Sequence, residues 1–243
     1  AIAALIERDM ALASAVVRTV NSALFGLVRR VESVPEAVRY LGTREVSALT
    51  FEIGLRGAFP PSPMLNALWD RAGRRGLAMG RASRALDVDP WLAHTAGLFA
   101  ESGQAALSVH DIEGYAKLVA AAPDAAAWLA AEQAAYGANH AVLGGALCQS
   151  WGLAGEVAAS VRLRPMALLS LTAEPSAAID AQWSGETFMV KRLLALGACV
   201  DAALDGVDAA DLARGSAAIA QRAGLEPALL LEAVTGAVAK LGG

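Results

Sequence analysis

The sequence predicts an all-α fold, and three observations support this prediction. Hydrophobic residues make up 56% of the 243 positions and aromatic residues only 5%, so small aliphatic side chains supply most of the core. Alanine, the best helix former, is a poor strand former. The sequence has no sustained alternation of β-branched and polar residues between turn residues. Residues that cap helices recur along the whole chain.

Cap and breaker residues set the bounds of the predicted helices. Asp9 caps the first helix, and Ser33 opens the second, with Glu36 three positions later as in a capping box. Prolines break the chain near residues 60–63, and Pro165 is expected to end a later helix. The predicted helices cover residues 9–22, 33–41, 43–57, 64–86, 89–107, 111–122, 123–136, 138–151, 154–164, 184–204, 209–223 and 227–241.

Two glycines, Gly97 and Gly103, interrupt the apolar helix predicted to begin at Asp89. Each costs up to about 1 kcal/mol relative to alanine inside a helix. We therefore expect a packing reason for both, such as the close approach of another backbone. Ala100 and Glu101 lie between them.

Charge and cysteine content limit the functional classes. The net charge of −4 and pI of about 5.4 argue against a general nucleic-acid-binding protein. Cys148 and Cys199 lie in apolar helical surroundings without C-x-x-C spacing, as expected of reduced thiols in a cytoplasmic protein. The longest stretch without Asp, Glu, Lys or Arg, residues 133–155, contains five glycines and predicts a buried helix with its flanks, not a membrane span.

The first residues already follow a helical pattern, without a signal peptide or an initiator methionine. We therefore expect the chain to be a piece of a longer protein.

Side chains that could hold a metal are sparse. The His-Asp dipeptide at His110 and Asp111 suits a metal site only if further histidines converge on it, and a helix-capping aspartate explains it more simply. The other histidines are His94 and His140, so three histidines on three helices supply one mononuclear site at best. No nucleophile elbow, Walker A loop or dinucleotide-binding fingerprint is present.

Arginines gather on the helix predicted over residues 64–86. Arg74, Arg81 and Arg84 fall near one face of it. This face is either a docking stripe for an acidic protein surface or a phosphate-bearing ligand, or an ordinary solvated face.

Several segments together resemble the HDOD family, bacterial helical signalling domains related to HD-type metal phosphohydrolases. They look like the family's “DPxL…NSAxFG”, “EAxxxLG” and “FGxxHxxxG…WxLP” blocks and the “AGLLHDIG” of catalytic relatives. The resemblance runs from the first residues to about Arg164. The matching segments are 8–12, 21–26, 36–42, 96–103, 136–144 and 151–153.

This resemblance implies an HD-like helical bundle with extra N- and C-terminal helices. We expect a single HDOD-type domain over residues 1–243. Its predicted parts are an N-terminal lobe at 1–62, an HD-like core at 63–175 and C-terminal helices at 176–243.

The chain departs from the HD pattern where catalytic relatives hold their metals. Arg71 stands in place of a histidine, and Ala100 and Glu101 in place of the His-Asp pair. Arg164 and Pro165 replace a closing His-His pair. Alanine has no donor atom, and arginine stays protonated and repels a cation.

Of the expected ligands, His140 alone keeps its type. The resemblance therefore implies no metal, no cofactor and no catalytic residue. A remnant pocket of Arg71, Glu101, His140 and Arg164 is the candidate ligand site. We expect Arg71 or Arg164 to pair with Glu101, because an isolated buried carboxylate is costly.

The expected function is a non-catalytic cytoplasmic signal-transduction domain, the output module of a bacterial response regulator. Its partner would be a signalling protein or a small signalling ligand, without membrane or general nucleic-acid binding, and homodimerisation stays open. The alternative is a divergent metal-dependent phosphohydrolase acting on a nucleotide or cyclic dinucleotide, which bound iron, manganese or zinc would reveal. A third interpretation is a sensor that uses the arginines of the remnant pocket for a phosphate or carboxylate.

Overall fold

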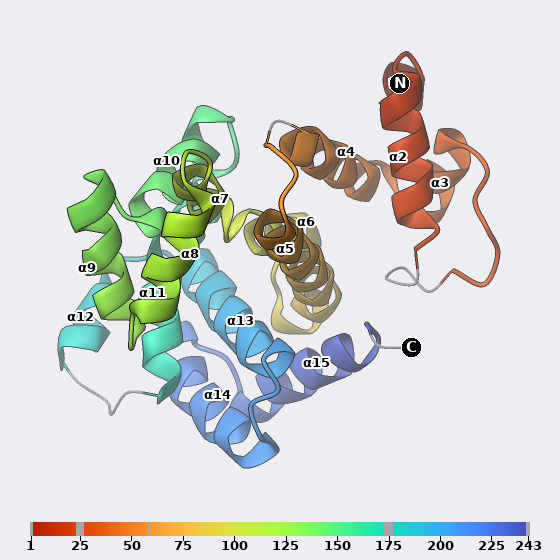
Figure 1. Cartoon of the computed structure of the whole chain (residues 1–243). Coiled ribbons are helices and arrows are strands. Elements are labelled where there is room, and N and C mark those ends of the chain that lie inside the picture. Colours follow the sequence, from red (N-terminus) through yellow and green to blue (C-terminus); the bar gives the residue numbers. More distant parts are fainter. Residues whose placement is uncertain (1, 23–26, 58, 173–176, 242–243) are drawn as a thin grey trace. The chain divides into compact units, whose positions relative to one another are not determined.

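The computed structural model describes residues 2–22, 27–57, 59–172 and 177–241, and these residues form helices and connecting segments without a strand (Figure 1). The all-α prediction is therefore confirmed. The chain divides into two compact units, residues 1–61 with 239–243, and residues 62–238. Each unit is described by itself below. The prediction of one domain with boundaries near 62 and 175 stays a prediction.

The first unit contains the helices α1 (Ile2–Ile6), α2 (Met10–Val20), α3 (Val34–Leu41) and α4 (Thr43–Gly57). Their packed side chains form a small aliphatic core: Ile6, Val16, Val20, Val31, Val34, Ala37, Val46 and Leu49. This core is built on the periodic apolar face that the sequence of α2 predicts.

Predicted caps begin two of these helices. The Asp9 carboxylate accepts hydrogen bonds from the first backbone N–H groups of α2, and Ser33 Oγ accepts one from the N–H of Glu36. The capping box is completed differently from the prediction, because Glu36 Oε2 accepts the N–H of Glu32 at 2.9 Å.

Part of the matching segment 21–26 shapes the loop after α2. The Asn21 side chain exchanges two hydrogen bonds with the backbone of Val31, at 2.7 and 2.8 Å. These bonds fasten the two sides of the loop together. Residues 23–26 of that segment lie outside the described residues.

The second unit holds the remaining helices, except for Ala239, the last residue of α15, which belongs to the first unit. They are α5 (Pro63–Ala82), the short 3-10 helix η2 (Ser83–Leu86), α6 (Pro90–Phe99), α7 (Ser102–Ser108), α8 (Ile112–Ala121), α9 (Ala125–Tyr136), α10 (His140–Ser150), α11 (Gly155–Thr172), α12 (Ala177–Ser184), α13 (Phe188–Leu204), α14 (Ala209–Ala223) and α15 (Pro227–Ala239). Helix α13 packs against α5, α11 and α14, and its apolar side chains are among the most buried of the chain (Figure 1).

Two predicted helix bounds are wrong. The helix predicted over 89–107 is interrupted between α6 and α7, where Glu101 has φ −111° and ψ 10°. The helix predicted to end at Pro165 continues to Thr172 as α11. An internal proline costs about 3 kcal/mol because it has no backbone N–H to donate and its ring clashes with the carbonyl group one turn earlier. The buried side chains that follow it, such as Met166 and Ala167, offset this cost by keeping α11 packed on its neighbours.

Both glycines of the central segment have the expected packing reason. A Cβ at Gly97 would lie 2.8 Å from the Cα of Gly76 on α5. A Cβ at Gly103 would lie 2.0 Å from the carbonyl oxygen of His140 on α10. The backbones of α6 and α5, and of α7 and α10, therefore approach too closely for any side chain larger than hydrogen.

No helix within the described part of the chain combines the length and apolar character needed to cross a bilayer.

Candidate functional site: an arginine and carboxylate cluster

Charged side chains from four elements of the second unit meet in its interior. We call them the arginine–carboxylate cluster, and its members are Arg71 and Arg75 on α5, Glu101 between α6 and α7, Arg164 on α11, and Asp201 and Asp205 at the end of α13. Charged residues are seldom buried unless they are paired. The buried members of the cluster are therefore expected to pair with one another.

Arg75 lies at the centre of the cluster with its side chain 1% exposed. Its Nε donates to Asp201 Oδ1 at 2.6 Å, and its Nη2 donates to Glu101 Oε1 at 2.7 Å. Asp201 and Glu101 are themselves only 1% and 3% exposed. One guanidinium thus joins two buried carboxylates, one from the break between α6 and α7 and one from α13.

Arg164 and Arg71 complete the shell around the same two carboxylates. Arg164 Nε donates to Asp201 Oδ2 at 3.0 Å, and its Nη2 lies 3.6 Å from Glu101 Oε1. Arg71 Nη2 lies 3.4 Å from Asp201 Oδ1, and its Nε lies 3.4 Å from Glu101 Oε1. Each of the two buried carboxylates is therefore reached by all three arginines.

The third carboxylate marks the outer edge of the cluster. Arg71 Nη2 donates to Asp205 Oδ2 at 2.9 Å, and Arg71 Nη1 donates to Asp205 Oδ1, so the two groups pair as a two-pronged fork. With three guanidinium groups and three carboxylates, the cluster is neutral as a whole.

The local environment favours the charged forms of three members of the cluster, Asp201, Arg75 and Arg71. Burial raises the pKa of Asp201, but the positive charges of Arg164 and Arg75 outweigh it and hold that pKa below its usual value. Burial lowers the pKa of Arg75, and the charges of Asp201 and Glu101 reverse that effect and raise it. The hydrogen bond with Asp205 raises the pKa of Arg71. The directions of these three pKa shifts all favour the charged forms of Asp201, Arg75 and Arg71.

The break between α6 and α7 positions Glu101. Its backbone leaves the helical conformation at that residue, and α7 starts again at Ser102. The side chain is thereby presented to the arginines of α5 and α11, while Ala100 beside it is buried and apolar. The close backbone contacts at Gly97 and Gly103 fix the segments before and after the break.

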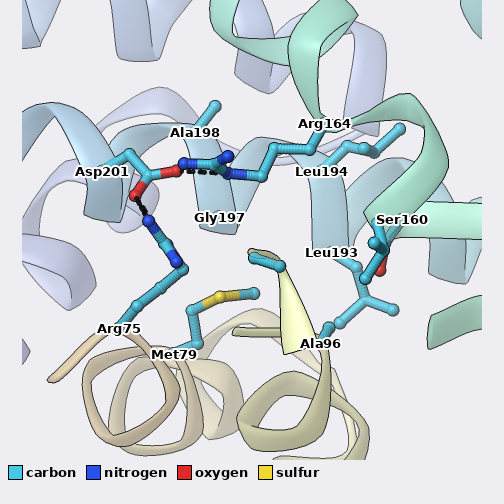
Figure 2. A pocket seen from close by; sticks show the side chains of 12 residues that line it. Arg75, Met79, Ala96, Ser160, Arg164, Leu193, Leu194, Gly197, Ala198 and Asp201 are labelled. Carbon is cyan, nitrogen blue, oxygen red and sulfur yellow. Dashed lines mark hydrogen bonds and ion pairs between the residues drawn. The ribbon is translucent and has the colours of Figure 1, made fainter. Parts of the chain in front are cut away.

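A small cavity adjoins the cluster (Figure 2). It has a volume of about 20 Å³, and Arg75, Arg164 and Asp201 form its polar wall. Figure 2 shows Arg75 and Arg164 reaching Asp201 from different helices, with Met79, Ala96 and Leu193 on the apolar side. Arg75 Nη1 is buried without a hydrogen-bond partner among the described residues. A volume of this size accommodates about one water molecule.

His140 lies in a different polar group from the one the sequence predicts. Its Nδ1 is 2.7 Å from Glu132 Oε2, and its backbone N–H donates to the same oxygen at 2.8 Å. The Tyr115 hydroxyl donates to Glu132 Oε1 at 2.6 Å. The ring centroids of Trp128 and His140 are 4.5 Å apart. No hydrogen bond or ion pair among the described residues joins His140 to the arginines.

Of the predicted pocket, Arg71, Glu101 and Arg164 come together, and His140 does not join them through a polar contact. Both Arg71 and Arg164 lie within ion-pair distance of Glu101, as expected. The hydrogen bond at 2.7 Å, however, comes from Arg75, which the sequence reasoning did not assign to the pocket. That these residues bind a ligand stays a prediction.

The predicted docking stripe is exposed. Arg74 and Arg81 on α5 and Arg84 in η2 all present their side chains to solvent. Exposure fits both a docking stripe and a solvated face, so the stripe stays a prediction. The simpler interpretation of the His-Asp dipeptide holds for Asp111, whose carboxylate caps α8.

Sequence reasoning missed Arg75 and Asp201, the two most buried members of the cluster. Asp201 did carry a signal, because it stands in the otherwise apolar run from Leu193 to Leu204. A carboxylate within such a run is expected to have a buried partner. Arg75 follows Arg71 by one helical turn and directly precedes Gly76, whose lack of a side chain allows a close neighbour.

The site does not fit a divalent metal ion. No group of three or more His, Cys, Asp or Glu side chains within the described ranges is placed to hold one. The two buried carboxylates already accept from guanidinium groups at hydrogen-bond distance. A cation placed there would lie beside three fixed positive charges, which repel it.

Comparisons with known proteins agree with this architecture. A candidate phosphohydrolase from Shewanella amazonensis has a similar structure, with a TM-score of 0.71 and 21% identity, covering 99% of this chain and 85% of that one. An HDOD domain protein from Geobacter sulfurreducens matches with a TM-score of 0.67 and 19% identity, covering 99% and 83% of the two chains. These similarities confirm the predicted HD-like helical bundle and speak for the fold alone.

Two further matches are the structure of a response regulator and the sequence of an uncharacterized protein. The response regulator MmoQ from Methylococcus capsulatus has a TM-score of 0.50 and 22% identity over 96% of this chain and 88% of its own. An uncharacterized protein from Treponema pallidum is 33% identical over 97 residues, which are 37% of this chain and 19% of that protein. This chain thus matches about a fifth of that relative's length.

The family comparison is the most extensive. The HDOD domain model matches residues 1–164, which is more than half of the chain and ends at the arginine of the cluster on α11. This chain therefore belongs to the HDOD domain family.

Proposed function

We propose that this chain is a non-catalytic cytoplasmic signal-transduction domain, the output module of a bacterial response regulator, which acts by recognising a partner protein or a small ligand. The observation that carries the proposal is the position of Arg75. Its guanidinium occupies the space between the two buried carboxylates, Glu101 and Asp201. The protein supplies its own cation where a metal enzyme of this fold would need an exchangeable one.

This arrangement opposes hydrolytic chemistry for a physical reason. A metal-dependent phosphohydrolase needs an ion with open coordination positions that polarises a water molecule. A guanidinium offers no coordination position, and the pKa of Arg75 is raised by its carboxylates, so it releases no proton at physiological pH. The guanidinium groups of the cluster therefore supply neither a Lewis acid nor a general base.

The printed names of similar structures support a signalling function. One is the MmoQ response regulator from Methylococcus capsulatus, and another is a candidate signal transduction protein from Marinobacter aquaeolei. Two others from Shewanella amazonensis are called phosphohydrolases, which keeps hydrolysis as the alternative to be tested. All four share less than 25% identity with this chain.

The experiment measures metal content and hydrolysis on the same preparation. The chain is purified without chelator, its iron, manganese and zinc are quantified, and hydrolysis of a cyclic dinucleotide and of nucleotides is followed with and without added Mn²⁺. We expect well under one metal ion per chain and no turnover above the buffer rate. Stoichiometric metal together with turnover that EDTA abolishes would overturn the proposal in favour of a divergent phosphohydrolase.

A further inference from the structure

Arg71 and Asp205 form the part of the cluster that solvent can reach. The Arg71 side chain is 33% exposed and that of Asp205 is 50% exposed, whereas their neighbours Glu101 and Asp201 are almost fully buried. Exposed ion pairs contribute little to stability, because water solvates the separated charges well. The carboxylate of Asp205 is therefore the one member of the cluster that can leave at small cost.

The position of Asp205 in the chain makes it easier for its carboxylate to separate from Arg71. It is the C-cap residue of α13, directly followed by Gly206 in a left-handed conformation with φ +74°. The C-terminal end of a helix carries a partial negative charge, which disfavours a carboxylate. The side chain of Asp205 is held there by two hydrogen bonds from Arg71.

Removing the Asp205 carboxylate leaves an uncompensated positive charge at the surface. The three arginines then face two carboxylates, Glu101 and Asp201, so that the cluster changes from neutral to a net charge of +1. Arg74, exposed and one helical turn beyond Arg71 on α5, adds a second positive charge nearby. An anion with two negative charges suits this edge better than the single carboxylate that it replaces.

We propose that the Arg71 fork is a binding site for a phosphate group, either free or carried by a small molecule, and that Asp205 is an internal stand-in for that phosphate. Binding exchanges the Asp205 carboxylate for phosphate oxygens on Arg71 Nη1 and Nη2. The inference rests on the proposed recognition function and names the class of ligand. The ligand lies at the outer edge of the cluster, because the inner cavity of about 20 Å³ is too small for a phosphate group.

The test is isothermal titration of the 243-residue chain in low-salt buffer with EDTA, using inorganic phosphate, adenosine 5′-monophosphate and acetate as separate probes. The variants are Asp205→Ala, Arg71→Ala and Arg71→Lys. Matched controls are Glu232→Ala, an exposed carboxylate on α15, and Arg214→Ala, an exposed arginine on α14. Far-UV circular dichroism checks that every variant is folded.

Asp205→Ala is expected to tighten phosphate binding by about three- to fivefold, since the internal competitor is gone. Arg71→Ala is expected to weaken it by at least about tenfold, and Arg71→Lys to weaken it as well because lysine lacks the fork. The two controls should leave the affinity unchanged. Tighter binding of the nucleotide than of inorganic phosphate would assign the phosphate to a nucleotide-like ligand, whereas equal affinities would assign it to free phosphate.

Three outcomes would overturn the inference. They are absence of phosphate binding to Asp205→Ala, undiminished binding to folded Arg71→Ala, and acetate binding as tight as phosphate binding. Because every titration contains EDTA, the result does not depend on metal chemistry. The inference and the proposed non-catalytic function can therefore fail separately.

Discussion

Replacing Asp201 by asparagine should remove a large part of the stability of the second unit. Asparagine keeps the size of the side chain and removes its charge. Arg75, with only 1% of its side chain exposed, would then keep Glu101 as its single close carboxylate at 2.7 Å, and Arg164 would lose its hydrogen bond at 3.0 Å. Breaking a buried ion pair by removing one partner costs about 3–5 kcal/mol.

Tryptophan fluorescence is the suitable assay, because all five tryptophans belong to the second unit (residues 62–238): Trp69, Trp91, Trp128, Trp151 and Trp183. Urea unfolding followed by this signal therefore reports the unit that holds the cluster. We expect Asp201→Asn to lower the urea midpoint with an unchanged slope. In a thermal scan, the same loss corresponds to a lowering of Tm by roughly 6–20 °C.

Asp205→Asn is the matched control, since it makes the same chemical change at the exposed edge of the cluster. Its expected cost is at most about 1 kcal/mol, because a half-exposed pair is solvated when it separates. Equal losses for Asp201→Asn and Asp205→Asn, or a loss below about 1 kcal/mol for Asp201→Asn, would refute the argument. The buried network would then not be what holds α5, α11 and α13 together.

Three further predictions concern pH, packing and thiol reactivity. Because the pKa of Asp201 is lowered in the folded state, the stability that Asp201 contributes is complete above its unfolded pKa of about 4 and is lost as the pH falls toward the folded pKa. The wild type should therefore lose its stability advantage over Asp201→Asn below about pH 5. A constant difference in stability from pH 7 to pH 3 would contradict this. Gly103→Ala should destabilise the protein by about 1–3 kcal/mol or more, because the new Cβ would lie 2.0 Å from a backbone oxygen. Gly236→Ala, whose Cβ would have no neighbour within 4 Å, should stabilise α15 by up to about 1 kcal/mol. Urea midpoints in the opposite order would be inconsistent with the packing. Burial raises the pKa of Cys148 and Cys199 to about 11. Both thiols should therefore react with a disulfide reagent about 100-fold more slowly in the folded protein than in the urea-unfolded protein. Similar rates in both states would show that the thiols are accessible.

The helix starts could be predicted from sequence because caps act over a few residues. Asp9, Ser33, Asp89, Asp111 and Asp208 each accept hydrogen bonds from N–H groups two or three positions ahead, as their place before an apolar run suggests. Such contacts need no knowledge of the rest of the fold. The glycine positions could be predicted as close contacts for the same local reason, although their partners could not.

The break at Glu101 and the composition of the cluster depend on contacts that sequence spacing does not reveal. Arg75 and Asp201 are separated by 126 positions, and no local pattern pairs them. The resemblance to HD-type enzymes implies metal-ligand positions at Arg71 and Arg164 and implies no role for Arg75. The interior proline of α11 is a similar case, because the packing that offsets Pro165 comes from other helices.

The network also bears on how such a domain can carry a signal. A metal centre exchanges ligands and water, so its chemistry is open to solution, whereas guanidinium groups tied to α5 and α11 are fixed by the chain. Arg75 and Arg164 each donate to an oxygen of the Asp201 carboxylate, so this buried carboxylate is already paired on both oxygens. The exchangeable bonds of the network are those of the exposed Asp205, at the end of the buried helix α13. A ligand that takes its place on Arg71 would bind where α5 meets α13, and any difference in affinity between two arrangements of these helices would shift the population toward one of them.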